Sequence, residues 1–271
     1  MASVLWAGGR LRDPGDPVLS GADAGFATGL GVFETCAVVS GRAFALTRHL
    51  DRLAASLRVL DLPRVDAALV RVAVSAVLGR VRVTVSPGAP GAGAPTLVVT
   101  GDAAPVRGPA HVVRSPWVRN ERSPLAGHKS TSYAADVLAL AAATRAGGNE
   151  AVLANTCGEL CEGTGSNVFV ERSGELVTPP LSAGCLPGVT RALVLEWSTS
   201  VGLPVREARA GELPWSVLDD VTHSAAGLAL SGSLRGFARV HALDGVATEV
   251  GALTAEVERL VCARMTEDFD P

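Results

Sequence analysis

The sequence predicts an α+β fold that is divided into two unequal parts. Leucines recur at helical spacing between Leu46 and Leu60, which is typical of an amphipathic helix. Short runs rich in valine and threonine, at 81–85 and 96–100, are bounded by glycine or proline and are typical of strands. Such segments alternate irregularly along the 271 residues, without an internal repeat or a regular βαβ series, so we expect α+β.

The first part is expected to begin with a hairpin, because Ala7-Gly-Gly9 separates two short apolar segments. A glycine-rich loop from residue 21 then leads into a strand at 32–39. The glycines at 25, 29 and 31 do not have dinucleotide-loop spacing, but they would allow the backbone to approach another group closely. Helices follow at 46–60 and 65–78, and then the two valine-rich strands.

A polar, arginine-rich segment marks the boundary between the parts, and we place the domains at 1–118 and 119–271. The second domain is expected to open with a long alanine- and leucine-rich helix at 133–146, ended by Gly147-Gly148. Further strands and helices alternate to the end of the chain. The expected strands are 150–154, 167–170, 175–178, 228–231 and 238–243, and the expected helices start near 189 and 250.

The bulk composition excludes several classes of protein. The net charge is −3, with no run of basic residues of the kind that nucleic-acid binding usually shows. No apolar run approaches the length needed to span a bilayer, and the first residues do not resemble a signal peptide. The five cysteines are scattered, so we expect buried thiols in a cytoplasmic protein, with no metal site.

Lys129 is the first candidate for a functional residue. The chain has 24 lysines and arginines, of which Lys129 is the one lysine, and its single tyrosine, Tyr133, follows four residues later. Lysine, unlike arginine, can lose its proton and attack a carbonyl group. The alternative is that the genome has replaced lysine with arginine and has left one lysine by chance. The other residues of the chain must decide whether Lys129 has a function.

An aldehyde cofactor bound to Lys129 would need further partners, and pyridoxal 5′-phosphate is the obvious candidate. Its ring nitrogen needs a carboxylate, for which Glu162 is available between glycines. Its phosphate needs helix-start N–H groups, hydroxyls and an arginine. Val189 and Thr190 open a helix, and Arg52 and Ser233 are further candidates. Taken singly, each of these is more often an ordinary helix start or surface residue.

Taken together and in this order, these segments resemble the class IV aminotransferase family, the fold-type IV group of pyridoxal-phosphate enzymes. The resemblance spans roughly residues 20 to 245. The segments that carry it are Phe33-Glu34, His49-Leu-Asp-Arg-Leu53, Lys129 with Tyr133, Glu150-Ala151, Glu162-Gly163 with Asn167-Val-Phe169, Thr178-Pro179 and Leu186-Pro-Gly-Val-Thr-Arg191.

The resemblance implies a small N-terminal α/β sandwich and a larger C-terminal pseudo-barrel domain, with a homodimer completing the site. It implies that Lys129 carries the internal aldimine and shuttles protons, and that Glu162 pairs with the pyridine nitrogen. Phosphate ligands would be Arg52, Val189, Thr190 and Ser233, and the substrate would be faced by Phe26, Leu30, Tyr133 and Arg235. Two departures are Leu30, where members often carry a polar or acidic residue, and His128, where an aliphatic residue is more usual.

The resemblance determines the cofactor better than the reaction. We expect a lyase that converts 4-amino-4-deoxychorismate to 4-aminobenzoate and pyruvate. Arginines that could match its anionic substrate are Arg82, Arg119, Arg122 and Arg235. The alternative is an aminotransferase acting on D-amino acids, branched-chain amino acids or amines with a keto-acid acceptor. A third hypothesis, a non-catalytic binding protein with the same fold, is opposed by the presence of Lys129, Glu162 and Arg52 together.

Overall fold

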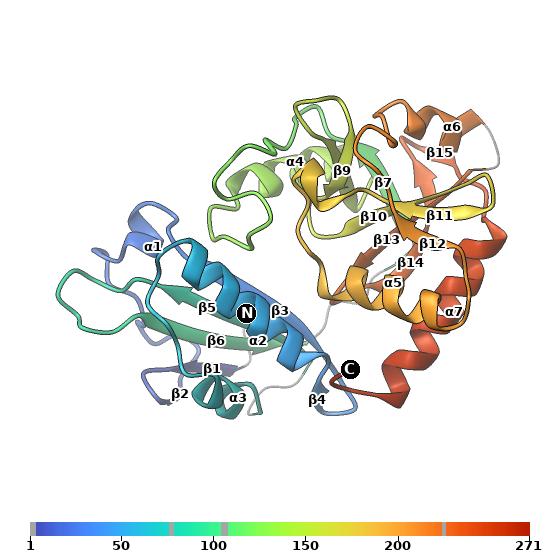
Figure 1. Cartoon of the computed structure of the whole chain (residues 1–271). Helices are drawn as coiled ribbons and strands as arrows, with labels where there is room; N and C mark the ends of the chain where they lie inside the picture. The colour runs from blue at the N-terminus through green and yellow to red at the C-terminus, as the bar shows by residue number, and fades with distance from the viewer. Residues whose placement is uncertain (1–3, 76–78, 104–107, 224–225) are drawn as a thin grey trace. The chain divides into compact units, whose positions relative to one another are not determined.

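The structure is a computed structural model that describes residues 4–75, 79–103, 108–223 and 226–271. Its contacts divide the chain into two compact units; Figure 1 colours the chain by residue number, from blue at the N-terminus to red at the C-terminus. The first unit is Met1–Val106 with His128–Tyr133 and Met265–Pro271; the second is Arg107–Gly127 with Ala134–Arg264. The domain boundary expected between residues 118 and 119 stays a prediction, because compactness does not test independent folding.

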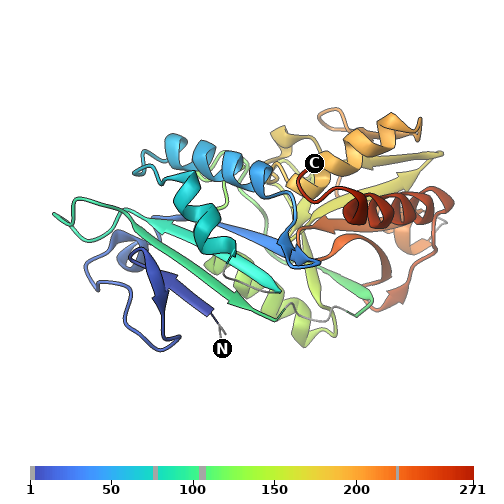
Figure 2. The same cartoon turned by 90° about the horizontal axis from the view of Figure 1, so that it is seen from below.

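The first unit is an antiparallel sheet in the order β2-β1-β6-β5-β3-β4. Helices α2 (Leu46–Val59) and α3 (Ala67–Ser75) lie on one face of this sheet (Figure 2). Leu50, Leu53 and Leu57 of α2 pack into its core, as the leucine spacing predicts. The strands are β1 (Val4–Ala7), β2 (Arg10–Arg12), β3 (Val32–Val39), β4 (Arg42–Ala43), β5 (Arg80–Ser86) and β6 (Thr96–Asp102).

Two local features of this unit are not apparent from the sequence pattern. The glycine-rich loop contains a short helix, α1 (Ala24–Ala27), because the Asp23 carboxylate accepts the Gly25 N–H at 2.7 Å and caps it. Helix α2 has no side-chain cap from its own N-terminal residue; instead, the Asp270 carboxylate accepts the Thr47 N–H at 2.7 Å. The last three residues of the helix predicted at 65–78 lie outside the described residues.

The second unit is a mixed sheet in the order β12-β11-β10-β13-β14-β7-β8-β9, with β15 paired to β14. Strand β9 also contacts β10, so the sheet curls back on itself, and the expected pseudo-barrel is confirmed. The strands are β7 (Ala110–Arg114), β8 (Glu150–Ala154), β9 (Leu160–Gly163), β10 (Asn167–Arg172), β11 (Glu175–Thr178), β12 (Val205–Glu207), β13 (Gly227–Gly232), β14 (Gly236–Leu243) and β15 (Val246–Ala247).

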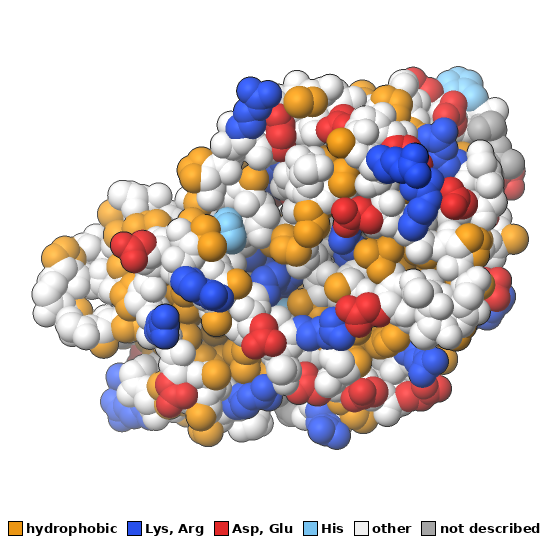
Figure 3. All heavy atoms as spheres, in the orientation of Figure 1, with side chains coloured by type: hydrophobic (Ala, Val, Ile, Leu, Met, Phe, Trp, Pro, Cys, Tyr) orange, Lys and Arg blue, Asp and Glu red, His pale blue; other side chains and the backbone are white. Residues whose placement is uncertain are grey.

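Helices surround this curled sheet. α4 (Ala134–Arg145) packs on β7 and β8, and α5 (Val189–Ser200) packs on β12, β13 and β14. The remaining helices are the 3₁₀ turn η1 (Leu181–Ala183), α6 (Val217–His223) and α7 (Ala252–Glu267). On the face drawn in Figure 3, acidic and basic side chains are interspersed. Among the described residues, no helix has the length and apolar character that a membrane crossing requires.

Candidate functional site

Lys129 lies in the first unit, on a segment that runs beside β3. The Phe33 N–H donates to the Lys129 carbonyl at 2.9 Å, and the Thr131 N–H donates to the Gly31 carbonyl at 2.8 Å. A side chain at Gly31 would collide with the Val85 carbonyl and the Thr131 hydroxyl, so a glycine is required for this close approach. These backbone contacts fix the position from which the lysine side chain extends.

Three polar or cationic groups gather on the Phe33 ring. Lys129 Nζ is 4.4 Å from the ring centroid and the Arg82 guanidinium carbon is 3.7 Å from it. Tyr133 meets the same ring edge-on, with 5.5 Å between centroids. Burial lowers the pKa of Arg82. Of the predicted residues, the structure therefore brings Lys129 and Tyr133 together.

Arg52 belongs to a different cluster in the same unit. Its Nε and Nη2 atoms donate to the two carboxylate oxygens of Glu34, each at 2.7 Å, and His49 Nδ1 is 2.7 Å from the same carboxylate. Burial acts to raise the pKa of Glu34, but the charge and hydrogen bonds of Arg52, with those of His49, outweigh it and lower that pKa to about 2. Sequence reasoning gave Glu34 no role of its own.

The cluster around Phe33 and the cluster around Glu34 lie on opposite faces of β3. Successive side chains of a strand point to opposite faces, so Phe33 and Glu34 face in opposite directions. Glu34 faces the side covered by α2, where it meets Arg52. Phe33 faces the other side, where it meets Lys129. The predicted substrate residues Phe26 and Leu30 are exposed, with 69% and 39% of their surfaces accessible.

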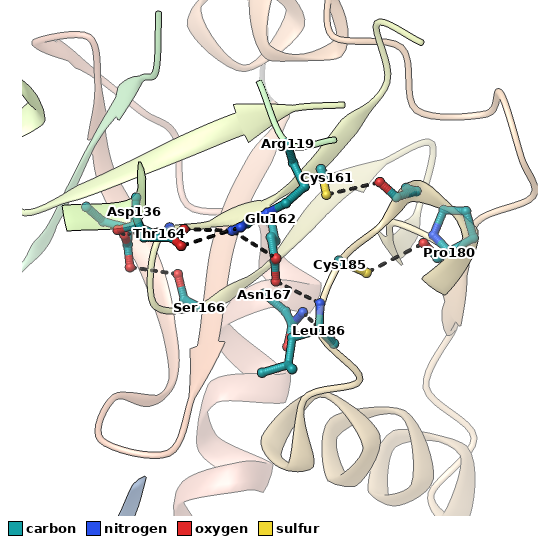
Figure 4. Close-up of polar contacts among 12 residues, drawn as sticks. Arg119, Asp136, Cys161, Glu162, Thr164, Ser166, Asn167, Pro180, Cys185 and Leu186 are labelled. Carbon is teal, nitrogen blue, oxygen red and sulfur yellow. Dashed lines mark hydrogen bonds and ion pairs between the residues drawn. The ribbon is translucent and has the colours of Figure 1, made fainter. Parts of the chain in front are cut away.

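Glu162 lies in the second unit, within strand β9 and directly before its last residue, Gly163. Its Oε2 accepts the Leu186 N–H at 2.9 Å, and its Oε1 is 3.2 Å from Arg119 Nη2 (Figure 4). Arg119 also donates to the buried Asp136, with 2.7 Å between Nη2 and Oδ1. Arg119, expected near substrate, is thus engaged with two carboxylates.

The segment before α5 is held by Glu162 and Asn167 together. The Asn167 amide donates to the Leu186 carbonyl at 2.9 Å, while Glu162 accepts from the N–H of that same residue. Gly188 precedes α5 and supplies no side-chain acceptor to its first turn, which contains Val189 and Thr190. A Cβ on Gly188 would overlap the Asn167 side-chain oxygen, so the segment passes where only glycine fits.

A second buried glutamate stabilises the turn that follows Glu162. Glu150 on β8 accepts the Thr164 N–H at 3.0 Å and the Ser166 hydroxyl at 2.9 Å, and the Thr164 hydroxyl also donates to it. Gly232, at the end of β13, lies against this turn: a Cβ there would be 3.2 Å from the Gly165 carbonyl. Sequence reasoning assigned no role to Glu150, although an acidic residue at the start of an apolar strand was a usable signal.

The predicted residues Ser233 and Arg235 lie in the turn between β13 and β14, where the Arg235 N–H donates to the Gly232 carbonyl at 3.1 Å. In the second unit the structure therefore links Glu162 to the start of α5, and it places the Ser233 turn against the loop that follows Glu162. Arg122 is 83% exposed at its side chain and is 3.7 Å from Glu121. Within the described chain, no group of histidines, cysteines and carboxylates could hold a metal ion.

Comparison with known proteins identifies this arrangement. The family model for class IV aminotransferases matches residues 31–243. The bifunctional aminodeoxychorismate lyase / D-amino acid transaminase of Mycobacterium tuberculosis is 30% identical over 279 residues, which cover 89% of this chain and 91% of that protein.

Solved structures agree with the fold. A hypothetical aminotransferase from Mycobacterium tuberculosis in its PLP-bound form has a TM-score of 0.83 and 28% identity, covering 96% of this chain and 97% of that one. The 4-amino-4-deoxychorismate lyase from Pseudomonas aeruginosa has a TM-score of 0.80 and 28% identity, covering 98% and 100% of the two chains. The predicted family and fold class are confirmed.

Proposed function

The chain belongs to the class IV aminotransferase family of pyridoxal-phosphate-dependent enzymes, and we propose that it is a lyase that converts 4-amino-4-deoxychorismate to 4-aminobenzoate and pyruvate. The observation that carries this proposal is the similarity, over 89% of the chain, to a protein named as an aminodeoxychorismate lyase. The same name includes D-amino acid transaminase, so transfer of an amino group to a keto acid is the second candidate.

The residues present fit pyridoxal phosphate. Among the described residues, the buried Ser231 hydroxyl has no hydrogen-bond partner, and it lies two residues before Ser233. The start of α5 offers N–H groups that no N-cap side chain occupies. Hydroxyls and helix-start N–H groups are the donors that a phosphate requires. A carboxylate at Glu162 suits a protonated ring nitrogen.

We assign the following roles to the residues of this chain. Lys129 is the covalent anchor of the cofactor aldehyde, and Glu162 binds the ring nitrogen. Arg52, Val189, Thr190 and Ser233 bind the phosphate; Phe26, Leu30, Tyr133 and Arg235 face the substrate.

When bound, the cofactor acidifies the substrate carbon that bears the amino group. In either candidate reaction a proton must leave that carbon. Our proposal is that Lys129 Nζ, which is 4.4 Å from the centroid of the Phe33 ring and 5.9 Å from that of the Tyr133 ring, takes and returns this proton. Arg82, on the same ring as Lys129, supplies a positive charge that suits a carboxylate of the substrate. These assignments make Lys129 the base and Arg82 a substrate-orienting residue.

The two reactions are distinguished by their products. Purified enzyme with aminodeoxychorismate is expected to form pyruvate and 4-aminobenzoate in equal amounts, and Lys129→Ala is expected to form neither. Incubation with D-alanine or a branched-chain amino acid alone is expected to leave the cofactor absorption unchanged. Rapid conversion of the cofactor to its amine form by such a donor, without pyruvate from aminodeoxychorismate, would instead establish the transaminase.

We also propose a homodimer located in the cytoplasm. Helix α4 exposes Val137, Leu138 and Leu140, which are 58%, 59% and 38% accessible, and adjacent apolar side chains of this kind often mark protein interfaces. Size-exclusion chromatography with light scattering is expected to give twice the mass of one chain. Leu138→Glu is expected to shift the measured mass toward that of one chain. A single-chain mass for the wild type would contradict the dimer.

A further inference from the structure

The cluster formed by Asp136, Arg119 and Glu162 combines three charged groups in the second unit (Figure 4). Asp136 is on α4 and is 4% exposed, Arg119 is on the segment after β7, and Glu162 is in β9, one residue before its end. Arg119 Nη2 reaches both carboxylates, at 2.7 Å from Asp136 and 3.2 Å from Glu162. The guanidinium is therefore shared, and Asp136 has the shorter contact.

We propose that Arg119 and Asp136 are positioning residues that set the negative charge Glu162 presents to the ring nitrogen of the cofactor. This inference rests on the proposed function, in which Glu162 is the partner of that nitrogen. A guanidinium beside Glu162 reduces the ability of the carboxylate to stabilise a pyridinium cation. Asp136 opposes this effect, because it neutralises part of the charge of Arg119.

The environment of Arg119 is consistent with a fixed charge. Burial acts to lower the pKa of the guanidinium, but the charges of Glu162 and Asp136, with the hydrogen bond to Asp136, outweigh burial and raise it. Within the described residues, its buried Nε atom has no hydrogen-bond partner. Its orientation therefore depends on the two carboxylates that its Nη atoms contact.

Among the described residues, the thiols of Cys161 and Cys185 are further titratable groups that interact with Glu162. Burial and the charge of Glu162 raise the pKa of the Cys161 thiol, and raise that of Cys185 to about 12, so both are neutral near pH 7. Glu150 is directed to Thr164 and Ser166 in the following turn. The negative charge of Glu121 also acts to raise the pKa of Cys161, and the Glu121 carboxylate accepts a hydrogen bond from the Thr156 hydroxyl.

Glu162 itself is oriented by the backbone. Its second oxygen accepts the Leu186 N–H, and Asn167 holds the carbonyl of that residue. A change at Arg119 or Asp136 is therefore expected to alter the charge around Glu162 more than its position. Because the charge around Glu162 can be changed without moving its carboxylate, the electrostatic role of Arg119 and Asp136 can be measured.

The test uses holoenzyme reconstituted with pyridoxal phosphate labelled with ¹⁵N in the ring, whose ¹⁵N chemical shift reports protonation of that nitrogen directly. Arg119→Gln is expected to raise the pH at which the nitrogen loses its proton by about one unit. Asp136→Asn is expected to lower that pH, because the charge of Arg119 is then less compensated. Arg119→Lys, which keeps the charge, is expected to remain close to the wild type.

Arg114→Gln is the matched control, since Arg114 also contacts two carboxylates, Asp219 at 2.8 Å and Asp244 at 3.3 Å. It is expected to leave the titration of the ring nitrogen unchanged. Opposite shifts in Arg119→Gln and Asp136→Asn support the inference. Unchanged titrations, or shifts in the same direction, would overturn it while leaving the proposed function intact. A wild type that binds no pyridoxal phosphate would overturn both. If Arg119→Gln does not fold, the titration of the ring nitrogen is compared between Asp136→Asn and Arg119→Lys. A lower pH of proton loss in Asp136→Asn than in Arg119→Lys then supports the inference, and equal values overturn it.

Discussion

Two glutamates, one in each compact unit, face an arginine in different ways. Glu34 receives two hydrogen bonds of 2.7 Å from Arg52 and lies 2.7 Å from His49. Glu162 receives one longer contact of 3.2 Å from Arg119, which contacts Asp136 more closely. Arg52 thus directs both of these hydrogen bonds to one carboxylate, whereas Arg119 divides its contacts between Glu162 and Asp136. We expect the first arrangement to stabilise the fold and to orient Arg52, and we propose that the second adjusts the charge that Glu162 presents to the cofactor.

The largest expected effect follows from breaking the Glu34 cluster. Glu34→Gln is expected to lower the free energy of unfolding by about 3 kcal/mol, because removing one partner of a buried ion pair leaves the other charge uncompensated. Urea unfolding at pH 7 measures this loss. Asp51→Asn, which changes an exposed carboxylate on helix α2 next to Arg52, is the control and is expected to change the stability little. Equal stability of Glu34→Gln and wild type would contradict a structural role for the cluster.

The same cluster predicts a pH dependence with a definite sign. The pKa of Glu34 is about 2 in the folded protein, below its ordinary value of 4.5. Its stabilising contribution is therefore complete above pH 4.5 and is lost as the pH falls toward 2. The difference in unfolding free energy between wild type and Glu34→Gln is expected to shrink over this interval. A difference that stays constant down to pH 2 would show that the carboxylate charge is not responsible.

Gly188→Ala tests the arrangement around Glu162 by steric means. The added methyl group overlaps the Asn167 side chain, so the variant is expected to lose about 1–3 kcal/mol of stability and to bind pyridoxal phosphate more weakly. Equilibrium dialysis of the apoprotein measures the affinity. Gly108→Ala, where no atom lies within 4 Å of the added group, is the control. Wild-type affinity in Gly188→Ala would argue against a role for this segment in phosphate binding.

The smallest effect is expected at an exposed ion-pair network. Arg206 contacts Glu175 at 2.8 Å and Glu212 at 2.6 Å, on a partly exposed surface. Arg206→Gln is expected to lower the stability by less than about 1 kcal/mol, and added salt should reduce the difference. Thermal unfolding at low and high salt checks this. A loss comparable to that of Glu34→Gln would remove the distinction between buried and exposed pairs.

Periodicity and resemblance predicted different parts of this protein. The leucine spacing predicted α2, which the structure confirms. The single lysine and the order of segments predicted roles for Lys129 and Glu162, and these roles stay predictions. The pairing of Arg119 with Asp136 was not predictable, because it joins a loop to a helix 17 residues away. Glu162 lies between glycines in the sequence, but pairing of β9 with β8 places it in a strand, which the local pattern does not show. Helix α1 was missed because four residues are too short for a periodic pattern.

The central claim is that Lys129 is the covalent anchor of pyridoxal phosphate, and the composition of the chain makes it directly testable. Lys129 is its one lysine, so borohydride reduction of the yellow holoenzyme can fix the cofactor to only one side-chain amine. Peptide mass spectrometry is expected to locate the reduced adduct on the peptide containing Lys129, and Lys129→Ala should carry none. An unmodified Lys129 peptide from a wild type that was incubated with pyridoxal phosphate and reduced would contradict the account.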